Sequence, residues 1–321
     1  MKVFSVIILI SLVAVGLVFA QTHEYRYSAD NGCVHKYNGS EGYNTLSPSE
    51  VKKSQFQQCL MMPGADFSGV NTLGSGAPDL SGSILTGANF SSAKIPGARM
   101  FNAQLEQVDF SNADLYRTHI RDANVSRAKF HNANLKKAQL SDSYIQRTDF
   151  SNANLNSSSL NEAKGYKTVF DGASMNDANL GTINCRECDF SHTLLKNSYL
   201  TIGNFMDSNF SYANLTGANL MGANLLNANF SNANLSKVVL NEYTQFKGAY
   251  FNSYTILPFT VDVAFNKGMV FITDDGHYVS TYSDYLNLTS NQGSRLRKFL
   301  PKTNPQISPQ QESLPGRKAR K

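Results

Sequence analysis

A five-residue period runs through the middle of the chain and constrains the fold more than any other feature. Every position divisible by five from 80 to 240 holds a large apolar residue, with Gly165 and Cys185 as the two exceptions among thirty-three. The residue two places earlier is Ala in eighteen of these repeats. An α-helix would scatter every fifth residue around its surface, and a strand repeats every second residue. The chain must therefore turn a corner every five residues, with the apolar residue and the one two places before it pointing inward.

A second period, of twenty residues, indicates how many corners make one coil. Phe occupies every twentieth position from 90 to 230, whereas the other centres are nearly all Leu, Ile, Met or Val. One coil then has four sides, and the Phe rings stack along one side as a core ladder. This pattern is typical of a solenoid, in which each coil packs only on its neighbours. The predicted ladder consists of Phe90, Phe110, Phe130, Phe150, Phe170, Phe190, Phe210 and Phe230.

The register shifts at both ends of the repeats. The repeat 65–67 is offset by three residues, and a bulge at 74–76 would absorb the offset, while 244–246 and 249–251 continue the pattern shifted by one. Open solenoid ends expose apolar side chains and unpaired backbone, so caps are expected. At the C-terminal end, 261–265 predicts a helical turn that ends at Gly268 before a last strand.

The N-terminal cap is predicted to contain a helix and a disulfide. Ser47 is a suitable N-cap, Pro48 suits the first helical position, and Glu50 follows three residues after the cap. Cys33 and Cys59 flank this region and are expected to pair, because cysteines in an exported chain commonly form disulfides. That bridge would hold the end of the helix.

The two chain ends differ from the body. Residues 1–20 combine Lys2 with an apolar run and a small-x-small ending, which predicts a secretory signal peptide, although an uncleaved membrane anchor is the alternative. No later segment is long and apolar enough to span a bilayer. Residues 291–321 hold eight Lys or Arg against one Glu and are rich in Pro, Gln and Ser, which predicts a disordered basic tail. Without the tail and Lys2 the net charge falls from +5 to −3.

Five regions follow from these boundaries. They are a signal peptide (1–20), an N-terminal cap (21–63), the solenoid (64–252), a C-terminal cap (253–290) and the basic tail (291–321).

The motif A-[ND]-[LF]-x-x, written here as ANFSS, ADLYR, ANLKK and ANLTG, resembles the pentapeptide-repeat family over residues 65–251. The resemblance implies an all-β fold, a right-handed quadrilateral β-helix with four pentapeptides per coil and short helical or strand end caps. The best-understood members are cytoplasmic, acidic, dimeric rods that mimic DNA and protect topoisomerases from quinolones. This chain departs from them in its export signal, its nearly neutral repeat surface and its basic tail.

No motif points to catalysis, and we expect neither an enzyme nor a cofactor or metal. Cys185 and Cys188 have the spacing of a redox CxxC, but the repeat register turns both inward. Unbonded buried fillers are the favoured interpretation, a local structural disulfide is the second, and redox activity or metal ligation is the third. An Asn column precedes the centres and is expected to be structural, because amide side chains bond local backbone at corners. It includes Asn214, Asn219, Asn224, Asn229 and Asn234.

Two outer surfaces are candidates for binding. Arg127, Arg147 and Lys167 recur every twenty residues on one corner, and Arg117 and Lys137 are placed on the adjacent corner. Like charges about one coil apart repel, so this ladder could bind an anion, against the alternative of a solvated surface. The second surface is an exposed apolar row that could serve a homodimer or a partner protein, against simple surface scatter. It comprises Tyr166, Met206, Leu226 and, on the neighbouring side, Met221.

The sequence thus predicts an exported, non-enzymatic binding or structural scaffold in the periplasm, the cell envelope or the medium. An unknown protein or an anionic envelope polymer is the expected partner, a homodimer is possible, and no specific nucleic-acid role is expected. The alternative is an inhibitor or protective protein that acts by surface mimicry on one macromolecular target.

Overall fold

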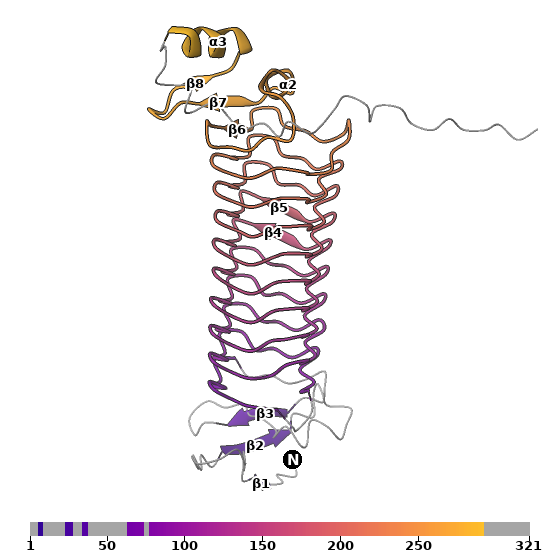
Figure 1. Ribbon diagram of the computed structural model, residues 1–321. Helices are drawn as coiled ribbons and strands as arrows, with labels where there is room; N and C mark the ends of the chain where they lie inside the picture. Colours follow the sequence, from indigo (N-terminus) through magenta and orange to yellow (C-terminus); the bar gives the residue numbers. More distant parts are fainter. Residues whose placement is uncertain (1–5, 9–22, 28–33, 38–62, 74–76, 292–321) are drawn as a thin grey trace, which may run out of the picture.

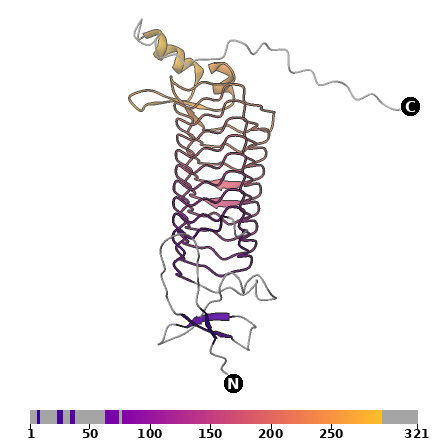
Figure 2. The same ribbon diagram turned by 60° about the horizontal axis from the view of Figure 1, so that its bottom comes forward.

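The structure, a computed structural model, describes residues 6–8, 23–27, 34–37, 63–73 and 77–291. Most of these residues wind into a β-solenoid, which Figure 1 shows from the side and Figure 2 shows tilted. In both views successive coils stack directly on one another along a single rod.

Single parallel β-bridges join the coils at every fifth residue through the middle of the rod, and each links residues twenty positions apart. Four bridges for every twenty residues agree with the coil that the two periods predict. Within the repeats, β4 (Lys164–Tyr166) and β5 (Asn184–Arg186) form a longer parallel pair of strands. One full coil is bridged through Asp109↔Lys129, Asp114↔Asn134, His119↔Gln139 and Asn124↔Tyr144.

The bridge register shifts at both ends, as predicted. Asp66 bridges Asn89, whereas Asp79 bridges Arg99, so three extra residues enter between these two repeats. The bulge predicted for them at 74–76 lies outside the described residues. Near the other end Asn224 bridges Gln245, which is the predicted shift of one. Asn234 then bridges Ile256, and this second shift was not predicted.

A turn residue with positive φ lies two places after each centre. Twenty-six non-glycine residues hold this left-handed conformation, with φ between 53° and 63°. Asn and Asp tolerate that region best, and the larger side chains adopt it at a conformational cost. The turn residue is the most outward point of each repeat, so side chains twenty residues apart form columns along the rod.

The Asn column makes the turns, as predicted. The Asn or Asp before a centre accepts a hydrogen bond from the backbone N–H two residues later, for example Ser111 N–H to Asp109 Oδ1 at 2.9 Å. This Asx turn satisfies a backbone donor that no neighbouring coil reaches. The same bond is present at all five predicted positions, Asn214, Asn219, Asn224, Asn229 and Asn234.

The core is a set of side-chain columns, and the Phe ladder is one of them. Its eight rings are at most 2% exposed, and neighbouring ring centroids lie 4.8–5.3 Å apart in stacked geometry. Phe67 extends the ladder by one step, 4.6 Å from Phe90. The inward Ala residues beside the ladder are fully buried and leave room for the rings. The predicted ladder is therefore confirmed.

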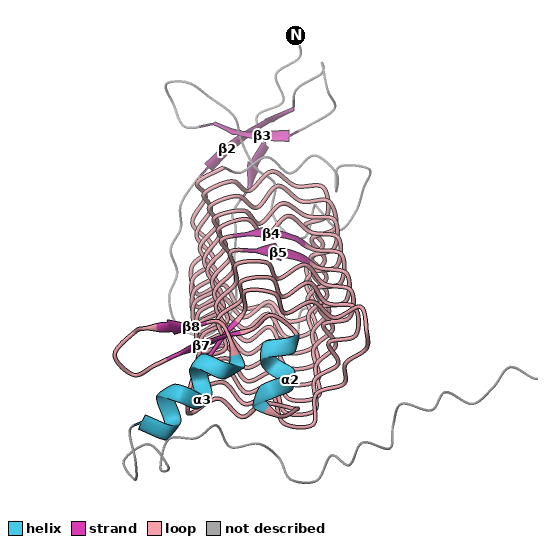
Figure 3. Cartoon of the chain, turned by 90° about the horizontal axis from the view of Figure 1, so that it is seen from above, coloured by secondary structure: helices cyan, strands magenta, loops and turns pink. Residues whose placement is uncertain are grey.

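The C-terminal cap contains the predicted helix and strand together with elements that were not predicted. Figures 1 and 3 show two helices and a small sheet across the end of the rod. Gly268, with φ +76°, ends the first helix as expected. The elements are β6 (Tyr250–Phe251), α2 (Val261–Asn266), β7 (Val270–Ile272), β8 (Tyr278–Val279) and α3 (Tyr282–Asn291).

Aromatic contacts close the end of the core. The Phe251 ring lies 5.7 Å from that of Phe265 on α2 and 5.4 Å from that of Phe271 on β7. Tyr285 on α3 covers Phe271 with ring centroids 5.0 Å apart, and it is only 5% exposed. Burial raises the pKa of the Tyr285 hydroxyl to about 12, because the phenolate would lose its hydration.

The N-terminal strands β1 (Val6–Ile8), β2 (His23–Tyr27) and β3 (Val34–Tyr37) form an antiparallel sheet in that order. No strand was predicted there, and β1 falls within the segment predicted to be a signal peptide. The predicted helix from Ser47 to Cys59 and the predicted Cys33–Cys59 disulfide lie outside the described residues, as does the basic tail from residue 292. Within the described ranges, no helix has both the length and the hydrophobicity to cross a membrane.

Candidate binding surfaces

The predicted cationic ladder divides into two groups on opposite sides of the rod. Arg127, Arg147 and Lys167 are turn residues of one column, all exposed. Arg117 and Lys137 are turn residues ten positions away in sequence, which is half of a twenty-residue coil. The prediction of adjacent corners was therefore wrong, because two repeats separate the groups rather than one. No single ligand on one side of the rod contacts all five cations.

Acidic side chains partly neutralise the first group. Lys167 Nζ lies 3.5 Å from Glu187 Oε2, the next residue of the same column. Arg127 and Arg147 form no ion pair with any described residue. The preceding turn column carries the opposite charge over the same coils, with Asp122, Asp142 and Glu162, and these also lack ion pairs in the described part of the chain.

A shallow hollow of about 370 Å³ opens beside Lys137, which belongs to the second group. Of the residues that line it, Arg121 and Lys137 are exposed and are called its rim. Ser141 is buried, Ser159 and Asn161 are half-buried, and these three are called its floor. Neither cation has an ion pair with a described residue. The hollow is lined by Arg121, Lys137, Ala138, Gln139, Ser141, Ser157, Ser159 and Asn161.

The floor of the hollow is a hydrogen-bonded cluster that leaves donors free. Ser141 Oγ donates to Asn161 Oδ1 at 2.7 Å, and Ser159 Oγ donates to the same oxygen at 2.6 Å. This fixes the Asn161 amide, whose Nδ2 group has no partner among the described residues. With the guanidinium of Arg121 and the ammonium of Lys137, the hollow presents hydrogen-bond donors of positive or neutral charge, the chemistry that binds a carboxylate, sulfate or phosphate.

The predicted apolar row is only partly exposed. Tyr166, Met206 and Leu226 share one column, as predicted, but all three are half-buried and Arg186 interrupts the column. The Tyr166 hydroxyl donates to Glu187 Oε2 at 3.3 Å, so its polar end is occupied. Met221 is 37% exposed and lies on the neighbouring side, as predicted.

A second group of apolar side chains, near Met221, was not predicted. Tyr199 and Val239 take the position before a centre that Asn usually fills, and they are 54% and 46% exposed. Ile202 is a turn residue next to them, and Tyr243 lies in the turn that follows Leu240; they are 69% and 68% exposed. Ile202 is β-branched and yet has φ 58°, an unusual conformation for such a residue. A search for non-Asn residues at these two repeat positions would have found the group.

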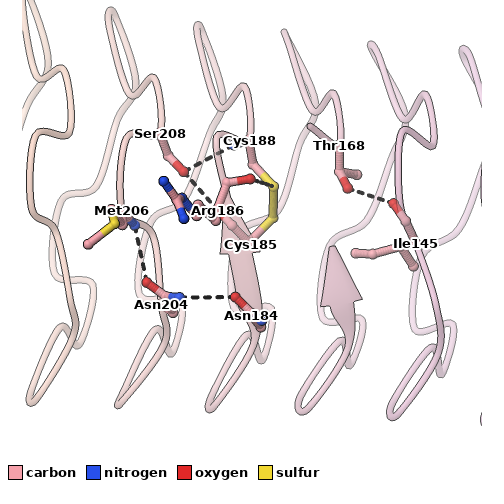
Figure 4. The surroundings of a disulfide bond; sticks show 9 residues. All are labelled: Ile145, Thr168, Asn184, Cys185, Arg186, Cys188, Asn204, Met206 and Ser208. Carbon is pink, nitrogen blue, oxygen red and sulfur yellow. Dashed lines mark hydrogen bonds between the residues drawn. A yellow bond between two sulfur atoms is a disulfide. The ribbon is translucent and has the colours of Figure 1, made fainter. Parts of the chain in front are cut away.

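The Cys185–Cys188 pair is a disulfide (Figure 4). Both residues are at most 1% exposed, so the inward orientation was predicted correctly, but the favoured interpretation of unbonded thiols was wrong. Gly165, in the preceding coil, leaves the space that the disulfide occupies. A Cβ at Gly165 would lie 3.2 Å from Cys185 Sγ and 2.9 Å from Thr168 Oγ1. The two exceptions to the five-residue rule are therefore stacked partners.

Hydrogen bonds hold the backbone around the disulfide. Ser208 Oγ donates to the Cys185 carbonyl at 2.8 Å and accepts from the Cys188 N–H at 3.1 Å (Figure 4). Thr168 Oγ1, in the coil before the disulfide, donates to the Ile145 carbonyl of the next coil down at 2.6 Å. These hydrogen bonds fix the backbone on both sides of the disulfide, as expected for a structural bridge. Among the described residues, no group of three or more His, Cys, Asp or Glu is placed to hold a metal ion.

One histidine forms a surface pair with a carboxylate. His192 Nδ1 lies 2.8 Å from Asp171 Oδ1, and Ser191 Oγ donates to the same oxygen at 2.8 Å. The hydrogen bond from His192 is the main cause that lowers the pKa of Asp171 below 3.8. The His192 ring also stacks on Tyr212, with centroids 5.0 Å apart. The side chains of His192 and Asp171 are 60% and 45% exposed, so we interpret the pair as a surface contact.

The repeats also match a known family profile. The profile described as pentapeptide repeats matches in 8 copies, over residues 79–112, 109–147, 143–181 and 204–241. Over these residues the chain belongs to the pentapeptide-repeat family. The matches cover the hollow, the charged columns from residue 117 to 167 and all of the Phe ladder except Phe190. None of the curated proteins compared matches the chain.

Solved structures similar to this pentapeptide-repeat protein include other members of the family. HetL, from the cyanobacterium Nostoc and involved in heterocyst differentiation regulation, is 22% identical, with 63% of this chain and 88% of HetL covered and a TM-score of 0.35. A pentapeptide-repeat protein from the Arabidopsis thaliana thylakoid lumen is 24% identical, with 30% and 68% covered and a TM-score of 0.30. QnrB1, a plasmid-mediated fluoroquinolone resistance protein, is 16% identical, with 57% and 91% covered and a TM-score of 0.33.

Proposed function

We propose that this protein is an exported, non-catalytic scaffold that binds an anionic envelope polymer through the hollow beside Lys137. Its solenoid is a right-handed quadrilateral β-helix, with four pentapeptides per coil, and it serves as a rigid support for surface side chains. The predicted signal peptide supports export, and so does a disulfide within the core, because disulfides persist in oxidising compartments.

The hollow is the observation that carries the proposal. Arg121 and Lys137 stand at its rim without ion pairs in the described part of the chain, above a floor fixed by Ser141, Ser159 and Asn161. Unpaired cations over fixed donors favour an anion, because no conformational entropy has to be lost from the floor when the ligand binds.

Charge along the rod favours a polymer over a small anion. Residues 115–170 contain nine Lys or Arg against four Asp or Glu, so the coils around the hollow are locally basic although the body of the chain is not. Arg117 lies one coil from Lys137 in the same turn column and continues the basic surface beyond the hollow. A flexible polyanion would contact both the hollow and this column.

Affinity for a polyanion tests the proposal. The probes are polygalacturonate, which carries carboxylates, and dextran sulfate, with neutral dextran as the blank. The double variant Arg121→Gln, Lys137→Asn removes both rim cations. Lys137 has positive φ, a conformation that the introduced Asn also tolerates. The matched control is Lys237→Asn, an exposed turn residue five coils along the same column.

The full-length double variant is expected to bind at least one polyanion about tenfold more weakly than the wild type, and the loss should shrink as salt is added. The control should bind like the wild type. Because the basic tail is present in all three proteins, it does not affect the comparison. Equal affinity of the double variant and the wild type for both polyanions would refute the role of the hollow.

A further inference from the structure

Two turn columns of opposite charge flank one side of the rod. The acidic column contains Asp122, Asp142 and Glu162, and the basic column contains Arg127, Arg147 and Lys167. Each acid is followed five residues later by a base, so every coil from 122 to 167 carries one of each at the two edges of the same side. This side, centred on Val125, Ile145 and Gly165, is called the dipolar side below. The hollow belongs to the neighbouring side, centred on Leu140.

Five of the six charged groups of the dipolar side have no ion-pair partner in the described part of the chain. Of the six groups only Lys167 forms an ion pair with a described residue, namely Glu187. The acids and bases do not pair with one another across the side that separates them. Within each column the like charges follow the coil spacing of about 4.8 Å, a distance at which they repel. A partner with the same pattern reversed from left to right would relieve this repulsion.

A second copy of the chain has that reversed pattern. When two rods lie parallel and face to face, a twofold axis along the rods brings the left edge of one copy over the right edge of the other. Asp122 of one copy then faces Arg127 of the other, and Asp142 faces Arg147. Antiparallel rods would instead place acid over acid and base over base. The charges therefore select the parallel arrangement.

The rest of the dipolar side is compatible with this arrangement. Above the six charged groups the first column continues with Thr182, Ile202 and Gly222, opposite Glu187, Asp207 and Asn227 of the second column, so no like charges meet. The surface between the columns carries the half-buried apolar row Tyr166, Met206 and Leu226, which the exposed Arg186 interrupts. It also carries Tyr144, which is 44% exposed and has Lys164 Nζ 4.6 Å from its ring centroid. Aromatic and apolar groups between charged edges are common in protein interfaces, and Arg186 has an ion-pair partner in its own copy, Asp207 at 3.3 Å.

We propose that the dipolar side is a homodimer interface in which two copies associate in parallel, with the acidic column of each copy on the basic column of the other. The contact is isologous, as in most homodimers. It goes beyond the polymer-binding function, because the hollow lies on another side and stays accessible in the dimer.

Charge exchange tests the pairing with little risk to the fold. The turn columns already hold Asp and Arg at φ 55–61°, so exchanging these residues keeps the backbone conformation. The first variant, Arg127→Asp with Arg147→Asp, makes both edges acidic. The second, Asp122→Arg with Asp142→Arg, makes both edges basic. The third variant combines all four substitutions and exchanges the charges of the two columns at these positions.

Sedimentation velocity of the full chain at low salt gives the readout, with thermal melting as the check of folding. The wild type and the fourfold variant are expected to dimerise. The first and second variants alone should show a dissociation constant raised by more than about tenfold, and their equimolar mixture should recover a heterodimer. High salt should weaken every one of these dimers.

Several results would overturn the interface. These are a monomeric wild type up to millimolar concentration, a mixture that stays monomeric, and variants that dimerise as well as the wild type. Loss of polyanion binding by the first variant without any change of mass would assign the basic column to an anionic ligand instead. The Arg121→Gln, Lys137→Asn variant should dimerise normally, which separates failure of this inference from failure of the polymer-binding proposal.

Discussion

Truncating one ring of the Phe ladder should destabilise the rod locally and strongly. Phe150 is fully buried, with its ring centroid 4.9 Å from that of Phe130 and 5.1 Å from that of Phe170. Phe150→Ala removes the ring from between two others and leaves a cavity that the rigid backbone, bridged to both neighbouring coils, has little freedom to fill.

The magnitude follows from burial and stacking. Loss of a fully buried Phe costs about 3–5 kcal/mol, of which the two stacked contacts contribute roughly 0.5–1.5 kcal/mol each. Phe67 provides an internal comparison, because it is only half-buried and, among the described residues, stacks on the ring of Phe90 alone. The cost of Phe67→Ala should therefore fall below that of Phe150→Ala.

Urea unfolding followed by circular dichroism is the assay. The surface control Gln146→Ala should change the free energy of unfolding by less than about 0.5 kcal/mol. Because coils contact only their neighbours, the Phe150 variant should also broaden the transition, with coils on either side of residue 150 unfolding separately. A loss below about 1 kcal/mol with an unchanged transition would refute the stacked, inward assignment of the ladder.

Three further predictions concern the disulfide coil and the cap. Gly165→Ala should cost about 1–3 kcal/mol in urea unfolding, because the added Cβ would lie 2.9 Å from Thr168 Oγ1 and 3.2 Å from Cys185 Sγ. Denatured, unreduced protein should yield no alkylated peptide containing Cys185 or Cys188, whereas reduction should expose both thiols. Burial raises the pKa of Tyr285 from 10.0 to about 12, so its contribution to the free energy of unfolding is complete below pH 10 and is lost as the pH rises toward 12. Melting temperatures of the wild type should therefore fall between pH 10 and 12, and in Tyr285→Phe the contribution of this residue to that fall should disappear.

The coil could be predicted because periodicity reports directly which residues point inward. The five-residue rule located the buried centres, and the twenty-residue spacing of Phe located the stacked ladder from Phe90 to Phe230. The register shifts near Phe67 and Gln245 were also readable, since an insertion displaces every later centre. The hydrogen bonds of the turns were predictable where one residue type recurs at one repeat position, as Asn does before the centres.

The surfaces were harder to predict because outward positions obey no packing rule. The cationic ladder was misplaced since Arg117 and Arg127 stand two repeats apart, which is half of a coil. The disulfide was underestimated because its fit depends on Gly165, twenty residues upstream of Cys185. The helix α3 was missed although Thr281 and Asp284 form an N-terminal capping pair, with Asp284 N–H donating to Thr281 Oγ1 at 3.1 Å.

The distance between two residues of one turn column tests the central claim, that side chains twenty residues apart stand one above another along a rigid rod. Spin labels are placed on Asn112→Cys and Asn232→Cys in unreduced protein whose Cys33 and Cys59 are replaced by Ser, diluted with unlabelled chain. Six coils separate the labels, so pulsed electron paramagnetic resonance should give a narrow distribution near roughly 29 Å. A broad distribution, or a mean beyond about 40 Å, would contradict the solenoid and the surface columns on which both proposals depend.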